Sequence, residues 1–242
     1  MPYQLYYWPS IQGRGEFVRL ALEDAGAGYV DVARSGGEAG PGTLALLQLL
    51  DDKSLARPPF APPILKAGTL IIGQTANILL FLGDRHGLAP RSEAGRLWVH
   101  QLQLTLADFV VEIHDAHHPV SVNLYYEDQR DEALRRAADF RDSRAPKYLG
   151  YFEEVLARNR SGSLYLAGAR RSYADLSLFQ VVDGLQYAFP RMMARLGRTC
   201  PRVLALHERI AGRPRLRAYR ASGRRIAFNE DGIFRHYPEL DG

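Results

Sequence analysis

Cysteine is almost absent from this sequence, and its scarcity limits what the chain can be. Cys200 is the only cysteine among 242 residues, which excludes an internal disulfide and a cysteine-rich metal site. No run of 18 or more apolar residues is present, and residues 1–10 have neither the basic start nor the apolar core of a signal peptide. We therefore expect a cytoplasmic protein with no membrane partner.

Excess positive charge is small and is concentrated in one segment. The net charge is +4, and residues 213–225 hold six arginines. Leu216 and Tyr219 lie three apart within this segment, a spacing typical of an amphipathic helix whose basic face is solvated. No nucleic-acid-binding motif accompanies the arginines, and few aromatic residues lie among them. We therefore expect no nucleic-acid partner.

The first 83 residues alternate between strand and helix patterns. Residues 14–25 place Phe17, Val18, Ala21 and Leu22 on one helical face, and Gly26 then favours a helix end. A glycine-rich stretch at 34–42 predicts a loop, and a tight hairpin turn is expected at Ala67 and Gly68. Strands are expected at 3–8, 29–32, 64–66 and 69–72, and helices at 14–25, 43–50 and 75–83, the last one closed by Gly83.

A proline-rich segment separates the two halves of this α/β pattern. Residues 58–63 contain four prolines, which can form neither a helix nor a central strand. We therefore expect an irregular turn there, with a functional reason for its composition.

From about residue 91 the hydrophobic periodicity is helical throughout. Residues 93–118 and 131–159 each predict one long helix. Ser172 and Asp175 have the spacing of a helix capping box, with the shorter aspartate in place of the usual glutamate. Residues 88–93 mark the expected boundary between the α/β half and the helical half.

Four stretches, in this order and spacing, resemble the cytosolic glutathione S-transferases of the tyrosine type, in particular the pi and sigma types. The resemblance covers nearly the whole chain. It implies a thioredoxin-like α/β domain over residues 1–84, with the order βαβαββα and a mixed sheet, followed by an all-α domain over residues 92–242. The stretches are residues 2–9, 13–22, 62–83, and 172–179 with 211–219.

The resemblance implies a detoxifying enzyme that takes glutathione as co-substrate and a small hydrophobic electrophile as its second substrate, works as a homodimer and needs no metal. Tyr7 would donate its hydroxyl hydrogen to the glutathione sulfur and hold it as a thiolate, the nucleophilic form. A free thiol with a pKa near 8.5 is only about 3% thiolate at pH 7. Arg14 would supply a nearby cation. The segment from Tyr7 to Arg14 is one residue longer than in the closest types, so a first-turn salt bridge is the alternative role for Arg14.

The tripeptide itself would contact several further residues. Pro62 and a cis Pro63 would meet its cysteinyl unit, although Pro62 has no N–H and can offer only its carbonyl. Gln74 and Thr75 would receive the γ-glutamyl end at a helix N-terminus. Asp108 would reach the γ-glutamyl amine from a partner chain, and a solvated helix acid is the alternative.

The remaining candidates lie around these contacts. Lys53, with Arg57 as the alternative, would hold the glycyl carboxylate. Trp8 would border glutathione and, with His118, wall the electrophile pocket. His114 and His118 are four apart, as in a helical metal pair, but no third ligand is evident, so we expect no metal.

Two functional readings stay open at this point. The first is an enzyme, with conjugation, isomerisation, peroxide reduction or ether cleavage as its reaction. The second is a non-catalytic glutathione-binding or scaffold protein of the same fold. The joint presence of Tyr7, Gln74, Thr75 and Asp108 favours the enzyme.

Overall fold

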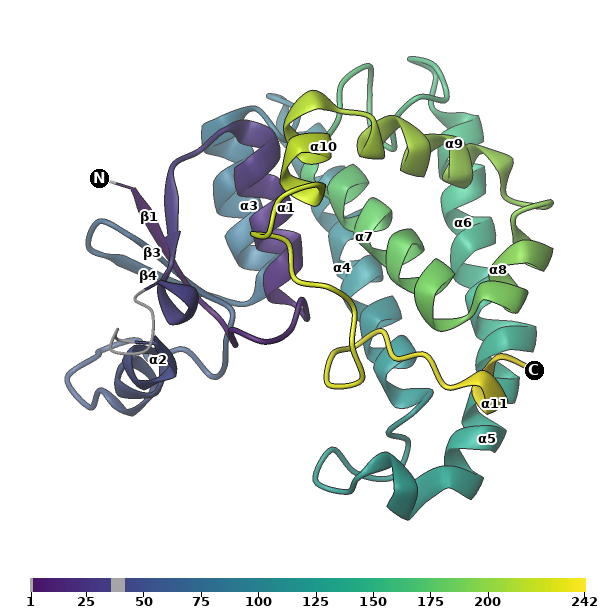
Figure 1. Ribbon diagram of the computed structural model, residues 1–242. Coiled ribbons are helices and arrows are strands. Elements are labelled where there is room, and N and C mark those ends of the chain that lie inside the picture. The colour runs from purple at the N-terminus through teal and green to yellow at the C-terminus, as the bar shows by residue number, and fades with distance from the viewer. Residues whose placement is uncertain (1, 36–41) are drawn as a thin grey trace.

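The computed structural model describes residues 2–35 and 42–242, so most of the expected loop at 34–42 lies outside the described residues. A mixed four-stranded sheet forms the core of the N-terminal half, in the order β2-β1-β3-β4 (Figure 1). Strand β1 pairs parallel with β2 and antiparallel with β3, and β3 pairs antiparallel with β4. The expected α/β order is confirmed. The elements are β1 (Tyr3–Tyr6), α1 (Gly15–Ala25), β2 (Tyr29–Asp31), a 3-10 turn (Val32–Arg34), α2 (Gly42–Asp51), β3 (Ile64–Ala67), β4 (Leu70–Gly73) and α3 (Thr75–His86).

The packing of α1 and α3 against this sheet follows from the apolar pattern. Leu5 of β1 and Leu65 of β3 are register partners, and both are fully buried. The α1 residues expected to face the core, from Phe17 to Leu22, are buried as well. Gly26 ends the helix in the left-handed conformation at φ 66°. Because β1 ends at Tyr6, Tyr7 lies directly after the carboxyl end of this strand, at the start of the loop that leads to α1.

Several element boundaries in this half differ from the expectation; β1, for example, ends at Tyr6 and not at residue 8. Ala67 pairs with Leu70, so the hairpin turn consists of Gly68 and Thr69. Helix α3 continues through Gly83 to His86 and ends at Gly87. A Cβ atom on Gly83 would lie 2.7 Å from the ring of Tyr173. Gly83 is therefore a close-packing position inside the helix and not its end.

The second half consists of helices packed around α7, which is buried over most of its surface. The Ser172 and Asp175 capping box is present at its start, as expected. Helix α4 ends at residue 115, before the expected 118, and a π-helical turn (Phe140–Arg144) divides the expected 131–159 helix. The helices are α4 (Glu93–Asp115), α5 (Arg130–Asp139), α6 (Ala145–Arg158), α7 (Tyr173–Ala188), α8 (Pro190–Leu196), α9 (Pro201–Ala211), α10 (Pro214–Arg220) and α11 (Pro238–Asp241), with a 3-10 turn at Tyr126–Gln129. Among the described residues, no helix combines the length and apolarity needed to cross a membrane.

The arginine-rich segment forms the expected amphipathic helix, with Leu216 and Tyr219 buried. Several of its arginines are paired, however, and are not simply solvated. Arg213 forms an ion pair with the fully buried Asp24 carboxylate of α1, and Arg225 donates to Asp183 of α7 at 2.7 Å. This segment therefore ties α1 to the helical half. Its acidic partners lie far away in the sequence, so local periodicity could not reveal them.

Candidate active site

Tyr7 lies directly after β1 and is only 5% exposed. Its hydroxyl oxygen accepts a hydrogen bond from the backbone N–H of Arg14 at 2.7 Å. Two glycines make this close approach possible, because a Cβ atom on Gly13 would lie 2.1 Å from the Tyr7 oxygen and one on Gly15 would lie 2.5 Å from the ring. The accepted bond occupies a lone pair of the oxygen and leaves the hydroxyl hydrogen free for a second acceptor.

The electrostatic surroundings keep Tyr7 protonated. Burial raises the pKa of Tyr7 above its usual value, while the Arg14 N–H and the charges of Arg14 and Arg19 oppose this rise. The Arg19 guanidinium lies 5.7 Å from the centroid of the ring. The hydroxyl of the neighbouring Tyr6 instead donates to Gln4 at 3.3 Å. Tyr7 therefore presents a neutral O–H donor with cations nearby.

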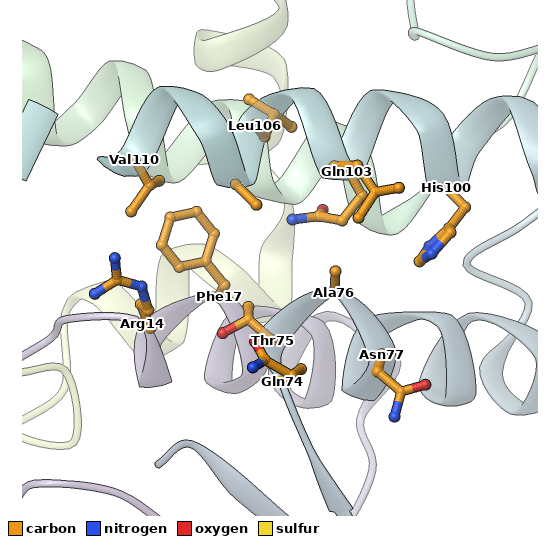
Figure 2. A pocket seen from close by; sticks show the side chains of 12 residues that line it. Arg14, Phe17, Gln74, Thr75, Ala76, Asn77, His100, Gln103, Leu106 and Val110 are labelled. Carbon is orange, nitrogen blue, oxygen red and sulfur yellow. The ribbon is translucent and has the colours of Figure 1, made fainter. Parts of the chain in front are cut away.

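A cavity of about 340 Å³ lies between α1, α3 and α4, and Arg14, which contacts Tyr7, borders it (Figure 2). Arg14, directly before α1, and Phe17 of α1 border it on one side, and residues 74–77 border it at the start of α3. Its remaining wall is one face of α4, formed by His100, Gln103, Leu104, Leu106, Ala107 and Val110.

The start of α3 has the features of an anion site. Gln74 has the unusual non-glycine backbone angle φ 66°, a strained conformation of the kind that concentrates at functional sites. No side-chain hydrogen bond from this residue caps the helix. The Thr75 hydroxyl oxygen is buried and has no partner among the described residues. The first N–H groups of α3 and this hydroxyl are therefore suited to receive an anionic group.

The α4 wall contains two more buried polar atoms without a partner among the described residues, Gln103 Oε1 and His100 Nδ1. Both residues border the same cavity as Thr75. Buried polar atoms are rarely left unpaired, so a ligand with several polar groups would suit this cavity. Sequence reasoning missed these α4 residues. Their signal was the spacing of His100, Gln103, Ala107 and Val110 along one helical face.

The structure brings only some of the expected site residues to this cavity. Arg14, Gln74 and Thr75 border it, and Tyr7 is joined to it through Arg14. The remaining expected residues are not among its lining residues in the described part of the chain. The Pro62–Pro63 bond is cis, as the resemblance implied. Lys53 and Arg57 are exposed between α2 and β3, and Asp108 is exposed on α4.

Histidines gather at the end of α4. Nδ1 of His117 lies 2.6 Å from Nδ1 of His118, and Nε2 of His117 lies 2.8 Å from the Ile233 carbonyl oxygen. Burial is the main reason why the pKa of His117 falls to about 2 and that of His118 to about 4. Burial also lowers the pKa of His114, with the nearby Arg14 charge contributing. The His117 and His118 rings are therefore uncharged at neutral pH. The described residues contain no group of three or more His, Cys, Asp or Glu side chains arranged to hold a metal.

Known proteins of one family resemble this chain. The family model for the glutathione S-transferase C-terminal domain matches residues 114–223. A glutathione S-transferase of Plasmodium falciparum is 26% identical over 220 residues, covering 89% of this chain and 93% of the relative. Glutathione S-transferase 2 of Onchocerca volvulus is 28% identical over 227 residues, covering 90% and 92%. The chain is therefore similar to glutathione S-transferases over most of its length.

A solved structure shows the same similarity at the level of fold. The structure of the Onchocerca volvulus Pi-class glutathione S-transferase superposes with a TM-score of 0.68 at 24% identity, covering 90% of this chain and 92% of that one. The expected thioredoxin-like α/β half followed by a helical half is confirmed. The exact division into residues 1–84 and 92–242 stays a prediction, and α3 itself extends to His86.

Proposed function

We propose that this chain is a glutathione transferase in which Tyr7 holds the glutathione sulfur as a thiolate. The observation that carries the proposal is the hydrogen bond from the Arg14 N–H to the Tyr7 oxygen, because it leaves the Tyr7 hydrogen to donate elsewhere. Lowering a thiol pKa by about two units requires roughly 2.7 kcal/mol of preferential stabilisation of the thiolate. A charge-assisted hydrogen bond from Tyr7 together with the Arg14 cation can supply energy of this order.

The cavity supports a position for the rest of the tripeptide. The γ-glutamyl carboxylate would bind the Thr75 hydroxyl and the first N–H groups of α3, beside Gln74, where a buried oxygen lacks a partner among the described residues. The cysteinyl unit would lie between Tyr7 and the carbonyl of Pro62, with the cis Pro63 next to it. Lys53, with Arg57 as the alternative, would hold the glycyl carboxylate from the exposed segment before these prolines.

The electrophile would lie on the other side of the sulfur, between Trp8 and His118. Trp8 is half-buried and directly follows Tyr7. His118 is uncharged at neutral pH because burial lowers its pKa to about 4. An uncharged, partly aromatic wall supports a small hydrophobic substrate. The reaction that follows thiolate formation and the expected cytoplasmic location stay predictions.

The exposed face of α4 supports a homodimer. Leu97, Leu104 and Val111 are 64%, 48% and 46% exposed, and their seven-residue spacing places them in one stripe along the helix. Asp108 lies four residues after Leu104 on the same stripe, where it could reach a bound ligand of a partner chain. Sedimentation of Leu104→Glu tests this: a dimeric wild type and a monomeric variant support the interface, while a monomeric wild type contradicts it.

Activity assays with an activated aryl halide test the central function. We expect glutathione-dependent conjugation by the wild type that falls by about two orders of magnitude in Tyr7→Phe, the typical cost of losing one donor to a developing anion. Binding of glutathione without turnover of any electrophile would instead favour the non-catalytic reading.

A further inference from the structure

The loop between Tyr7 and Arg14 is held by the helical half of the molecule. Gln12 in this loop is 5% exposed, and its Nε2 donates to the carbonyl oxygen of Ile226 at 2.6 Å. Its Oε1 accepts from Nε2 of Gln180 at 2.7 Å, and Gln180 is fully buried within α7. One buried side chain thus joins the loop to two segments more than 150 residues away.

Neighbouring contacts involve the same two segments. Asn229 donates from Nδ2 to the carbonyl oxygen of Ser10 at 2.8 Å. Arg225 donates to Oε1 of Gln180 at 3.2 Å, which fixes the orientation of that amide. We call residues 221–237 the tail. Figure 1 shows the tail as the yellow segment that runs from α10 past α1 toward α11. The tail and α7 therefore anchor the loop at both Ser10 and Gln12.

This anchored loop presents Arg14 to Tyr7. The carbonyl oxygen of Gln12 accepts from the backbone N–H of Glu16 at 2.9 Å, so Gln12 also opens the first turn of α1. Arg14 lies between these two residues, and its N–H points at the Tyr7 oxygen. A shift of the loop would move both the Arg14 N–H and the Arg14 cation relative to Tyr7. Hydrogen bonds and near-attack geometry are sensitive to displacements of this kind.

We propose that Gln12 is a positioning residue for thiol activation, through which α7 and the tail fix Arg14 against Tyr7. The proposal rests on the thiolate role of Tyr7 proposed above. The charged and titratable groups around this region are Arg14, Glu16 and Arg19 at the start of α1, His114 of α4 and Arg225 of the tail. Arg19 also contacts the loop, because its Nη1 donates to the backbone carbonyl oxygens of Ile11 and Gln12 at 3.5 and 3.4 Å. Among these groups, Arg14 is the one whose backbone N–H contacts Tyr7. Loss of the Gln12 contacts therefore weakens activation without removing any group that touches glutathione.

The test replaces Gln12 with methionine, which keeps the volume of the side chain and removes both hydrogen bonds. We expect the thiol pKa of bound glutathione to rise by about one unit. At saturating glutathione, kcat/KM for the aryl halide would then fall about tenfold at pH 6, where the thiolate is scarce. At pH 9, where the thiol is ionised without help, it would stay within about twofold of the wild type. The KM for glutathione would stay within about twofold, since its contacts at α3 remain. A purely structural role would lower kcat/KM equally at both pH values.

Two further variants keep the test decisive. Gln180→Met removes one of the two Gln12 bonds from the α7 side, and it is expected to shift the pH profile in the same direction if Gln12→Met does not fold. Gln186→Met, an exposed position on the same helix, is the matched control and is expected to match the wild type. A lowered thiol pKa in the wild type that is unchanged in both Gln12→Met and Gln180→Met would overturn this inference alone. An unshifted thiol pKa in the wild type would overturn the proposed function instead.

Discussion

The backbone N–H of Arg14 donates to the hydroxyl oxygen of Tyr7 at 2.7 Å, so the loop after β1 folds back onto the tyrosine. This single contact joins the candidate donor, directly after β1, to the candidate cation, directly before α1. It also explains the glycines on either side of Arg14, because a side chain at either position would collide with the Tyr7 ring or hydroxyl.

Substitution of Gly13 tests this close approach. Gly13 has φ +45°, and a Cβ atom there would lie 2.1 Å from the Tyr7 oxygen. We expect Gly13→Ala to lose at least about tenfold in kcat/KM, since an ångström-scale displacement of catalytic groups has effects of this size or larger. Steady-state kinetics with an aryl halide measure it.

Gly68→Ala is the matched control for that variant. Gly68 has a similar φ of +62°, but a Cβ atom there would have no neighbouring atom within 4 Å. Both variants should lose about 1 to 2 kcal/mol of stability from the left-handed backbone, but only Gly13→Ala should lose activity. Equal activity in the two variants would show that the contact with Tyr7 does not matter.

Thr75→Val tests the anion site at the start of α3. The substitution keeps the shape of the side chain and removes the buried hydroxyl, which has no partner in the described part of the chain. A hydrogen bond to a charged group contributes about 1.5 kcal/mol or more, so we expect the KM for glutathione to rise roughly tenfold with kcat at saturation nearly unchanged. Thr105→Val is the control, because the Thr105 hydroxyl bonds within α4 to the Gln101 carbonyl oxygen. If KM is the same in Thr75→Val and the wild type, the carboxylate does not bind there.

Features that depend on residues close together in the sequence could be predicted, and features that depend on contacts between distant residues could not. The capping box of Ser172 and Asp175 and the buried face of α1 depend on neighbours within one or two helical turns, so the sequence alone could predict them. The predicted helix end at Gly83 was wrong, because glycine is common at helix ends. Glycine is needed here because the ring of Tyr173, 90 residues away, leaves no room for a side chain.

The residues of the candidate site also fall into those that local motifs predict and those that depend on long-range packing. The sequence alone could predict four site residues because they lie within motifs that resemble a family: Tyr7, Arg14, Gln74 and Thr75. His100 and Gln103 were missed because their part in the site depends on how α4 packs across α3. The anchoring of Gln12 by Gln180 was equally invisible, since 168 residues separate the two glutamines.

Glu112 provides a test of stability that is independent of the active site. Its carboxylate accepts from Arg144 at 2.7 and 2.8 Å, from Arg136 at 3.2 Å and from Tyr148 at 3.0 Å. These bonds, led by Arg144, lower the pKa of Glu112 from 4.5 to about 2. A carboxyl with a lowered folded-state pKa contributes stability that is complete above pH 4.5 and is lost as the pH falls toward 2.

We therefore expect Glu112→Gln to lower the free energy of unfolding by about 1 to 2 kcal/mol at pH 7, and by clearly less at pH 3. Urea unfolding at the two pH values measures the difference. Glu154→Gln, which removes an exposed pair with Arg158, should change stability by less than about 0.5 kcal/mol at either pH. A gap between Glu112→Gln and the wild type that is the same at pH 7 and pH 3 would rule out the proposed ionic contribution.

The most direct test of the central claim is an ultraviolet titration of the thiolate of glutathione bound to the wild type, to Tyr7→Phe and to Tyr6→Phe. If Tyr7 holds the thiolate, the thiol pKa lies about two units below the free value of roughly 8.5 in the wild type and in Tyr6→Phe, and it returns toward the free value in Tyr7→Phe. A thiol pKa that is the same in the wild type and in Tyr7→Phe would contradict this claim.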